Sequence, residues 1–350
     1  MQPIVRPSSR SPSTQGSDVL GSSRQKLSSA YDVAVLDLDG VVYVGPDAVD
    51  GAPEALNQAR AGGMNLAFVT NNAARPPRVV GGHLRRLGVN ARDEDVVTSA
   101  QAAARLLANQ LAPGSKVFLL GGAGLDEAVR ERGLEPVIDP AADIAAVVQG
   151  YGPDMPWKQV MQGAGLVASG LPWVAANMDL TIPTATGVGP GNGALVRLIA
   201  QFAGREPQVA GKPMPPLFEE TLTRVGGSHP LVVGDRLDTD IEGAVTMGWD
   251  SLLVLTGVTG LDELLGARPR ERPTYVAPGL EALAEPQQAP EQSSEGASLG
   301  GWTASVDAGR LTVSGNGGVA DWWRVAATEA WRHLDETGQP VAADGVEPPR

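Results

Sequence analysis

Short apolar runs alternate with amphipathic stretches along residues 31–284. Val33–Leu36 and Asn65–Val69 are apolar runs that end in polar clusters, which is typical of buried strands. Helical periodicity follows them in Ala52–Ala61 and Arg78–Leu87. Further strands are predicted at Lys116–Leu120, Ala145–Val148, Trp173–Ala176, Leu231–Val233 and Ser251–Leu255, and further helices at Ala100–Gln110, Gly193–Ala203 and Pro216–Val225. This alternation predicts an α/β fold with a mainly parallel sheet, whose ligands bind at the carboxyl ends of the strands.

Two segments outside this pattern are poor in large apolar side chains. Residues 1–30 are rich in Ser, Pro, Gln and Arg, and residues 285–299 are rich in Pro, Gln, Glu and Ser. Such compositions bury too little apolar surface to offset the entropy lost on ordering. We therefore expect a disordered N-terminal tail over 1–30 and a linker over 285–299.

Residues 300–350 form a tryptophan-rich C-terminal appendage, with Trp302, Trp322, Trp323 and Trp331 among the 7 tryptophans of the chain. Two strand-like pieces suit a hairpin, and an apolar stripe over 320–336 suits a helix. About fifty residues cannot easily bury four indoles alone. The favoured interpretation is that this piece docks on its own catalytic domain. A subunit or partner surface, or a relic of another domain type, are the alternatives.

Composition and charge exclude several classes of protein. The 350 residues contain no Cys and 3 His, which excludes disulfides, thiolate metal sites and a cysteine nucleophile and disfavours a multi-histidine centre. A net charge of -13 argues against a nucleic-acid partner. No apolar run approaches the ~20 residues of a membrane span, and no secretory signal is seen. We expect a cytoplasmic protein that binds neither nucleic acid nor membrane.

Four polar clusters contain the candidate chemistry, and three of them directly follow predicted strands. They are Asp37-Leu-Asp-Gly-Val41, Thr70-Asn-Asn72, Gly211-Lys-Pro213 and Gly234-Asp-Arg-Leu-Asp-Thr-Asp240. Asp37 and Asp39 can face one small site if the backbone turns at Gly40, and two close carboxylates repel unless a cation lies between them. Each cluster alone is a weak signal, whereas all four in this order are hard to obtain by accident.

Over roughly Tyr31 to Ala284 the clusters resemble the haloacid dehalogenase (HAD) superfamily of phosphotransferases. The closer resemblance is to its NagD-like and para-nitrophenyl-phosphatase-like subfamily, which includes phosphoglycolate/glycerol-3-phosphate phosphatases and pyridoxal phosphatases. The segments that carry it are DLDGVVYVG (37–45), FVTNNAAR (68–75), GKP (211–213), VGDRLDTDIEGA (233–244) and LTGVT (255–259).

The resemblance implies a role for each cluster. Asp37 is expected to be the nucleophile that forms an aspartyl phosphate, and Asp39 the acid and then the base. Lys212 is expected to neutralise charge on the nucleophile and on the phosphoryl group. Phosphate oxygens are expected to bind Thr70, Asn71 and Gly40. The implied cofactor is Mg²⁺, held by Asp37, the Asp39 carbonyl and Asp235, with Asp240 ordering its water shell.

Spacing locates a second domain. Asp37 and Thr70 are 33 residues apart, room for one helix and one strand, whereas 142 residues separate Thr70 from Lys212. A domain must be inserted there, where the HAD family places its large α/β cap. We therefore expect a Rossmann-like HAD core over 31–99 and 209–284 and a cap over 100–208. Residues expected to contact substrate are Asn72, Arg75, Asn177, Asp179 and Asn192, although helix capping competes evenly at Asn71, Asn72 and Arg75.

The expected function is a Mg²⁺-dependent phosphomonoesterase for a small phosphorylated metabolite, glycerol 3-phosphate or 2-phosphoglycolate. Family members that prefer pyridoxal phosphate carry a histidine near position 182, where this chain has Ile182. The alternatives are a sugar- or nucleotide-monophosphate phosphatase, a phosphomutase or phosphotransferase, and a non-catalytic binding protein on the HAD fold. A homodimer is possible.

Overall fold

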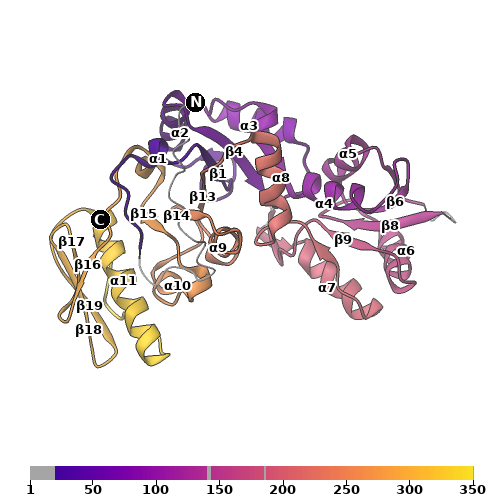
Figure 1. The fold of residues 1–350 in the computed structure, drawn as a ribbon. Helices are drawn as coiled ribbons and strands as arrows, with labels where there is room; N and C mark the ends of the chain where they lie inside the picture. Colours follow the sequence, from indigo (N-terminus) through magenta and orange to yellow (C-terminus); the bar gives the residue numbers. More distant parts are fainter. Residues whose placement is uncertain (1–19, 140–142, 185–186, 350) are drawn as a thin grey trace, which may run out of the picture.

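The structure is a computed structural model that describes residues 20–139, 143–184 and 187–349. Figure 1 shows three parts that follow one another across the molecule. The catalytic core lies in the middle, the cap at one end and the C-terminal part at the other. Among the described residues, no helix combines the length and the apolar character that a bilayer span requires.

Six parallel strands form the core sheet in the order β15-β14-β13-β1-β4-β5. Their bounds are β1 Val33–Leu36, β4 Asn65–Thr70, β5 Val96–Thr98, β13 Pro230–Gly234, β14 Asp250–Val254 and β15 Tyr275–Ala277. The central strand β1 pairs with both β4 and β13, so the three polar clusters that follow these strands meet at one edge of the sheet. The predicted parallel α/β core is confirmed.

Both faces of the core sheet are buried, because successive side chains on a strand point to opposite sides. Ala34 and Leu36 pack in one hydrophobic cluster, whereas Val33 and Val35 pack in another. The surrounding elements are α1 Leu27–Ala30, α2 Ala52–Ala61, α3 Pro77–Arg86, α8 Pro215–Val225, α9 Glu242–Met247, α10 Leu261–Leu265, the hairpin β2 Tyr43–Val44 with β3 Asp47–Ala48, and the single turns Asp93–Asp95, Leu237–Ile241, Pro269–Glu271 and Leu280–Ala284.

The cap has a parallel sheet of its own, in the order β12-β9-β8-β6-β7. Its elements are β6 Lys116–Leu120, β7 Glu135–Val137, β8 Ile144–Gln149, β9 Trp173–Ala175, β12 Gln208–Val209, α4 Ser99–Ala108, α5 Ala123–Glu131, α6 Trp157–Ala168, α7 Asn192–Ala203, and the hairpin β10 Thr181–Thr184 with β11 Gly187–Pro190. Alanines of α4 pack in one hydrophobic cluster with residues of both sheets, so the cap and the core share part of their interior.

The segment 285–299, expected to be a linker, contains two strands of a third sheet. This antiparallel sheet consists of β16 Glu291–Ser293, β17 Gly296–Leu299, β18 Trp302–Asp307 and β19 Arg310–Gly315, and it packs against α11 Val319–Thr337. Ala297 is fully buried in the same hydrophobic cluster as α11. The polar composition of the segment misled the prediction, because the apolar partners come from elsewhere in the chain.

The prediction of a disordered tail over 1–30 is also wrong for residues 20–30. Leu20 and Leu27 are buried, and Ser23 exchanges two backbone hydrogen bonds of 2.8 Å with Gln287. Contacts with parts of the chain that are distant in sequence thus offset the entropy lost when residues 20–30 become ordered. Residues 1–19 lie outside the described residues.

The C-terminal part packs on the core through its helix. The indole N–H of Trp331 donates to the carbonyl of Leu264 at 2.8 Å, and the guanidinium of Arg272 lies 5.4 Å from the centroid of the indole. Arg272 also makes a two-pronged ion pair with Asp335 of α11. Trp322, Trp323 and Trp331 lie in one hydrophobic cluster with Leu253 and Val276 of the core sheet, and Trp302 packs against this cluster, in agreement with the favoured interpretation.

Candidate active site

The first motif forms a tight turn after β1. The carbonyl of Leu38 accepts from the N–H of Val42 at 2.9 Å, and the N–H of Gly40 donates to the carbonyl of Tyr43 at 2.8 Å. Gly40 has a φ of 85°, and a Cβ there would come 2.5 Å from Asp235 Oδ2. This glycine is therefore required by backbone conformation and by the approach of Asp235. Its N–H is already bonded, which differs from the predicted phosphate contact.

Lys212 connects the first and last motifs through its ammonium group. Its Nζ lies 2.7 Å from Asp37 Oδ1 and 2.6 Å from Asp240 Oδ1, and the lysine is buried. Burial alone lowers the pKa of Lys212, but the carboxylates of Asp240 and Asp37 outweigh it and raise the pKa above its usual value. The lysine is therefore a permanent cation beside Asp37.

Asp235 is fully buried, and its two carboxylate oxygens differ in their hydrogen bonding. Its Oδ2 accepts from the N–H of Val258 at 2.7 Å, whereas its buried Oδ1 has no hydrogen-bond partner among the described residues. Burial, followed by the nearby charge of Asp37, raises the pKa of Asp235 to about 6. An orphaned carboxylate oxygen of this kind is expensive unless a proton or a cation satisfies it.

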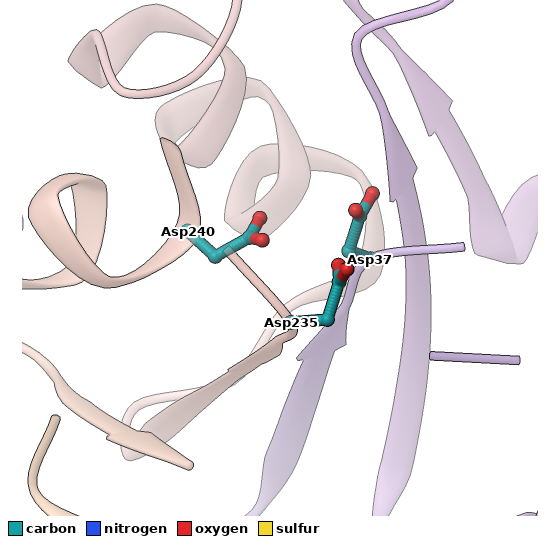
Figure 2. A group of neighbouring side chains, drawn as sticks. All are labelled: Asp37, Asp235 and Asp240. Carbon is teal, nitrogen blue, oxygen red and sulfur yellow. The ribbon is translucent and has the colours of Figure 1, made fainter. Parts of the chain in front are cut away.

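The carboxylates of Asp37, Asp235 and Asp240 offer oxygens that all lie within 4.8 Å of one another. Figure 2 shows Asp37 and Asp235 close together and Asp240 facing them from the helical turn that follows Asp235. An all-oxygen set of anionic donors with one orphaned oxygen fits a hard divalent cation such as Mg²⁺. Because both carboxylate oxygens of Asp240 already accept hydrogen bonds, one from Lys212 and one from the N–H of Arg236, it fits the predicted role beyond the direct ligands.

The segment after β14 supports the metal-site residues, and the sequence had assigned it no role. Thr259 donates from Oγ1 to the carbonyl of Asp235 at 2.6 Å, and Thr256 donates to the carbonyl of Gly40 at 2.6 Å. A Cβ at Gly257 would lie 2.0 Å from Asp235 Oδ2. The motif LTGVT at 255–259, noted only for its likeness to the family, was the signal that could have revealed this support.

Asp39 lies at the mouth of the site as an exposed residue. Partial burial of the carboxyl group nevertheless raises the pKa of Asp39 to about 6, and the negative charge of Asp37 adds to this rise. Arg75, also exposed, opposes the rise through its positive charge. A carboxyl group with such a pKa can both donate and accept a proton near neutrality.

The cluster after β4 is less open to phosphate than predicted. Thr70 accepts from the N–H of Asn72 through Oγ1 at 3.0 Å, and Asn72 Oδ1 accepts from the N–H of Ala74 at 2.9 Å. The Asn72 side chain thus stabilises a local turn, but it does not cap α3, whose N-cap residue is Pro76. The amide of Asn71 bonds to Lys212 and Asp179 instead of facing solvent.

The cap residues predicted to contact substrate divide into two groups. Asn177 and Asn192 are buried, and their amides bond inside the protein: Asn177 donates to the carbonyl of Asn71, and Asn192 donates to the carbonyl of Asn177. Asp179 is only partly buried, and it accepts from Asn71 at 3.0 Å. Asp179 therefore remains the candidate of the three for contact with substrate.

Two family models match the motif regions of the chain. One, described as haloacid dehalogenase-like hydrolase, matches residues 34–135, and a HAD-hydrolase-like model matches residues 209–283. A curated relative, D-glycerol 3-phosphate phosphatase of Mycobacterium tuberculosis, is 42% identical over 301 residues, which is 85% of this chain and 82% of the relative. The chain belongs to the haloacid dehalogenase-like hydrolases, and its fold is that of the phosphatases in that family.

Other similar proteins are also phosphatases. Acid sugar phosphatase of Staphylococcus aureus is 35% identical over 258 residues, covering 73% of this chain and 98% of the relative. The crystal structure of glycerol phosphate phosphatase from M. tuberculosis in complex with magnesium has a TM-score of 0.81 at 40% identity and covers 91% of this chain and 94% of that one. The p-nitrophenyl phosphatase of Archaeoglobus fulgidus has a TM-score of 0.67 at 28% identity, over 73% of this chain and 98% of that one.

Proposed function

We propose that this protein is a Mg²⁺-dependent phosphomonoesterase that hydrolyses glycerol 3-phosphate through an aspartyl phosphate. The observation that carries the proposal is Asp37 between a buried lysine and two buried carboxylates at one edge of the sheet. Similarity to a D-glycerol 3-phosphate phosphatase and to a structure in complex with magnesium supports the substrate and the metal.

In the first step a carboxylate oxygen of Asp37 attacks phosphorus, and the bond from phosphorus to the leaving alcohol oxygen breaks. Asp39 transfers its proton to that oxygen, so the alcohol leaves neutral. In the second step Asp39 takes a proton from water, whose oxygen attacks phosphorus. The acyl phosphate bond then breaks, and inorganic phosphate and free Asp37 result.

Lys212 holds the attacking carboxylate in place and opposes the charge of the incoming phosphate. Asp37, Asp235 and the Asp39 carbonyl would hold Mg²⁺, which would neutralise charge between the nucleophile and the substrate. Asp240 holds Lys212 in place and would order water molecules around the metal.

Two other substrate classes remain as candidates. The relative named acid sugar phosphatase favours a sugar phosphate. The smaller hydroxy acid 2-phosphoglycolate suits the same core, because the groups at the strand ends contact only phosphate and metal. A panel of glycerol 3-phosphate, 2-phosphoglycolate, a hexose phosphate and a nucleoside monophosphate separates these candidates by kcat/KM, and a higher value for any of the others would overturn the glycerol 3-phosphate assignment.

The nucleophile is tested by Asp37→Asn, which keeps the shape of the side chain but cannot form the phosphoenzyme. We expect turnover to be lost while the circular dichroism spectrum is unchanged. Acid quenching with labelled substrate should trap a covalent phosphate on the wild type and none on the variant. Full activity of a folded variant would refute the assignment.

The metal role is tested by Asp235→Ala against Asp238→Asn. Asp238 lies on the same loop but is exposed and paired with Arg236. Titration calorimetry with Mg²⁺ should show weaker binding for the first variant and wild-type binding for the second. An unchanged affinity in Asp235→Ala would remove it from the ligand set.

A further inference from the structure

A series of buried amide side chains runs from the cap sheet to the core. Gln149 ends β8, Asn192 begins α7, Asn177 follows β9 and Asn71 follows β4. Gln149 Nε2 donates to Asn192 Oδ1 at 3.3 Å, and Asn192 Nδ2 donates to the carbonyl of Asn177 at 2.8 Å. Asn177 Nδ2 then donates to the carbonyl of Asn71 at 2.6 Å. Each amide thus connects two elements that are distant in sequence.

The series ends on the main chain of Lys212. Asn71 Oδ1 accepts from the N–H of Lys212 at 2.8 Å, and Asn71 Nδ2 donates to the carbonyl of Lys212 at 3.1 Å. The same Nδ2 donates to Asp179 Oδ1 of the cap at 3.0 Å. Both amide hydrogens of Asn71 are therefore engaged, which leaves this side chain no donor for a phosphate oxygen.

The neighbouring glycine supports the same arrangement. A Cβ at Gly211 would lie 2.5 Å from Asn71 Oδ1 and 2.6 Å from the carbonyl of Ala176. The close approach of the Asn71 amide to the connection between β12 and α8 is thus built into the backbone. Ser99, at the start of α4, also donates to the carbonyl of Asn71 at 2.6 Å. Asn71 therefore contacts both segments through which the chain passes between the core and the cap.

We propose that Asn71 is a positioning residue for Lys212, and that Gln149, Asn192 and Asn177 transmit to it the position of the cap. The proposal rests on the catalytic role proposed above for Lys212. The Nζ of this lysine serves two carboxylates at 2.7 and 2.6 Å, so a shift of its main chain changes both contacts at once. A misplacement of about 1 Å in such a site can cost about 10²-fold in rate.

A double-mutant cycle on kcat tests whether Asn71 acts through Lys212. In the wild-type background, we expect Asn71→Ala to lower kcat about 10²-fold and to leave KM nearly unchanged. In the Lys212→Ala background the same substitution should cause no further loss, because the lysine that Asn71 positions is already gone. An equal loss in both backgrounds would overturn the proposal, since a purely structural role acts independently of the lysine.

The chain offers a matched control in Asn57, on α2. Its amide makes the same pair of backbone bonds, donating to the carbonyl of Gly88 at 2.9 Å and accepting from the N–H of Asn90 at 2.8 Å. Asn57→Ala should lower the unfolding free energy and leave kcat unchanged. A comparable loss of kcat in Asn57→Ala would show that loss of stability alone explains the Asn71 effect.

A second variant keeps the proposal testable if Asn71→Ala does not fold. Asn177→Ala removes one bond to the carbonyl of Asn71 and should lower kcat less, with the loss again absent in the Lys212→Ala background. Persistence of that loss without the lysine would contradict the proposal. If Lys212→Ala keeps the wild-type kcat, the lysine has no catalytic role, and both that role and this inference are wrong. If Lys212→Ala lowers kcat but the losses of kcat in the cycle are additive, only this inference is wrong.

Discussion

The catalytic core joins its two neighbours in different ways. The cap meets it at the carboxyl ends of the strands through the apolar packing of α4 and through directed polar contacts, the amide series that ends at Asn71. The C-terminal part meets the opposite side of the core through a tryptophan-rich apolar cluster and the ion pair of Arg272 with Asp335. Hydrogen bonds specify position, whereas apolar burial is non-directional and supplies most of the stability. We call the interface between cap and core the cap joint, and the interface between the C-terminal part and the core the C-terminal joint. Substitutions at the cap joint should therefore change catalysis, and substitutions at the C-terminal joint should change stability.

The cap joint has a second polar centre, distant from the amide series in sequence. Glu220 of α8 is fully buried and pairs with Arg105 at 3.0 Å, with Arg132 at 2.5 Å and with Arg224. Arg105 belongs to α4 and Arg132 follows α5, so one carboxylate of the core holds two segments of the cap. Two separate polar contacts fix the orientation of the cap better than either alone.

The C-terminal joint also reaches elements next to the metal site. Its hydrophobic cluster includes Leu237 and Ile241 from the loop that carries Asp235 and Asp240, as well as Leu264. Arg324 of α11 donates to the carbonyl of Val276 at 3.1 Å and to Gln287. The appendage is thus part of the packing behind the loop that carries Asp235 and Asp240.

The largest effect is expected for Trp331→Ala. Truncation of a buried tryptophan costs about 3–5 kcal/mol, and this one also loses its bond to Leu264. Denaturant unfolding should show the loss, while kcat per folded molecule stays close to the wild-type value. A fall in kcat as large as that of Asn71→Ala would abolish the distinction between the two joints.

A smaller loss is expected for Glu220→Gln, which keeps the shape of the side chain but removes its charge. The three arginines are partly exposed and can turn to water, so we expect a cost of about 1.5–3 kcal/mol, the usual range for bonds to charged groups. Thermal unfolding measures it, and kcat should fall as the cap loosens. Unchanged kcat would leave the amide series as the contact that positions the cap.

A third prediction concerns the place where α5 touches the core. A Cβ at Gly124 would lie 2.6 Å from the carbonyl of Ala73, a rigid backbone atom, so Gly124→Ala should destabilise by about 1–3 kcal/mol. Gly165→Ala on α6 is the matched control, since nothing lies within 4 Å of its Cβ, and it should stabilise by about 0.5–1 kcal/mol. Equal shifts in melting temperature would show that the contact at Gly124 is not tight.

The smallest change in stability, about 1–2 kcal/mol, is expected for Asn192→Ala, which removes two bonds of the amide series, one from Gln149 and one to the carbonyl of Asn177. Its kcat should fall by the same factor for glycerol 3-phosphate and for p-nitrophenyl phosphate, because the buried amide positions the site and does not contact substrate. A KM that rises only for glycerol 3-phosphate would instead support the substrate contact expected from sequence.

Much of the fold followed from local patterns. The apolar runs before Asp37, Thr70 and Asp235 predicted three strands of one parallel sheet, and these strands are neighbours in the structure. The spacing of 142 positions from Thr70 to Lys212 likewise required an inserted domain. Short strands such as β5, β7 and β15 were not predicted, because three residues leave too little periodicity.

The sequence by itself determined which residues leave the strand ends, because strand burial and motif order are properties of adjacent positions in the chain. Only the tertiary structure decided what those residues contact. Asn71 bonds to Lys212, which is 141 positions away, and the polar segment 285–299 forms strands against a distant helix. The partner of a polar side chain depends on which distant elements packing brings within about 3 Å of it, and no local pattern encodes that distance.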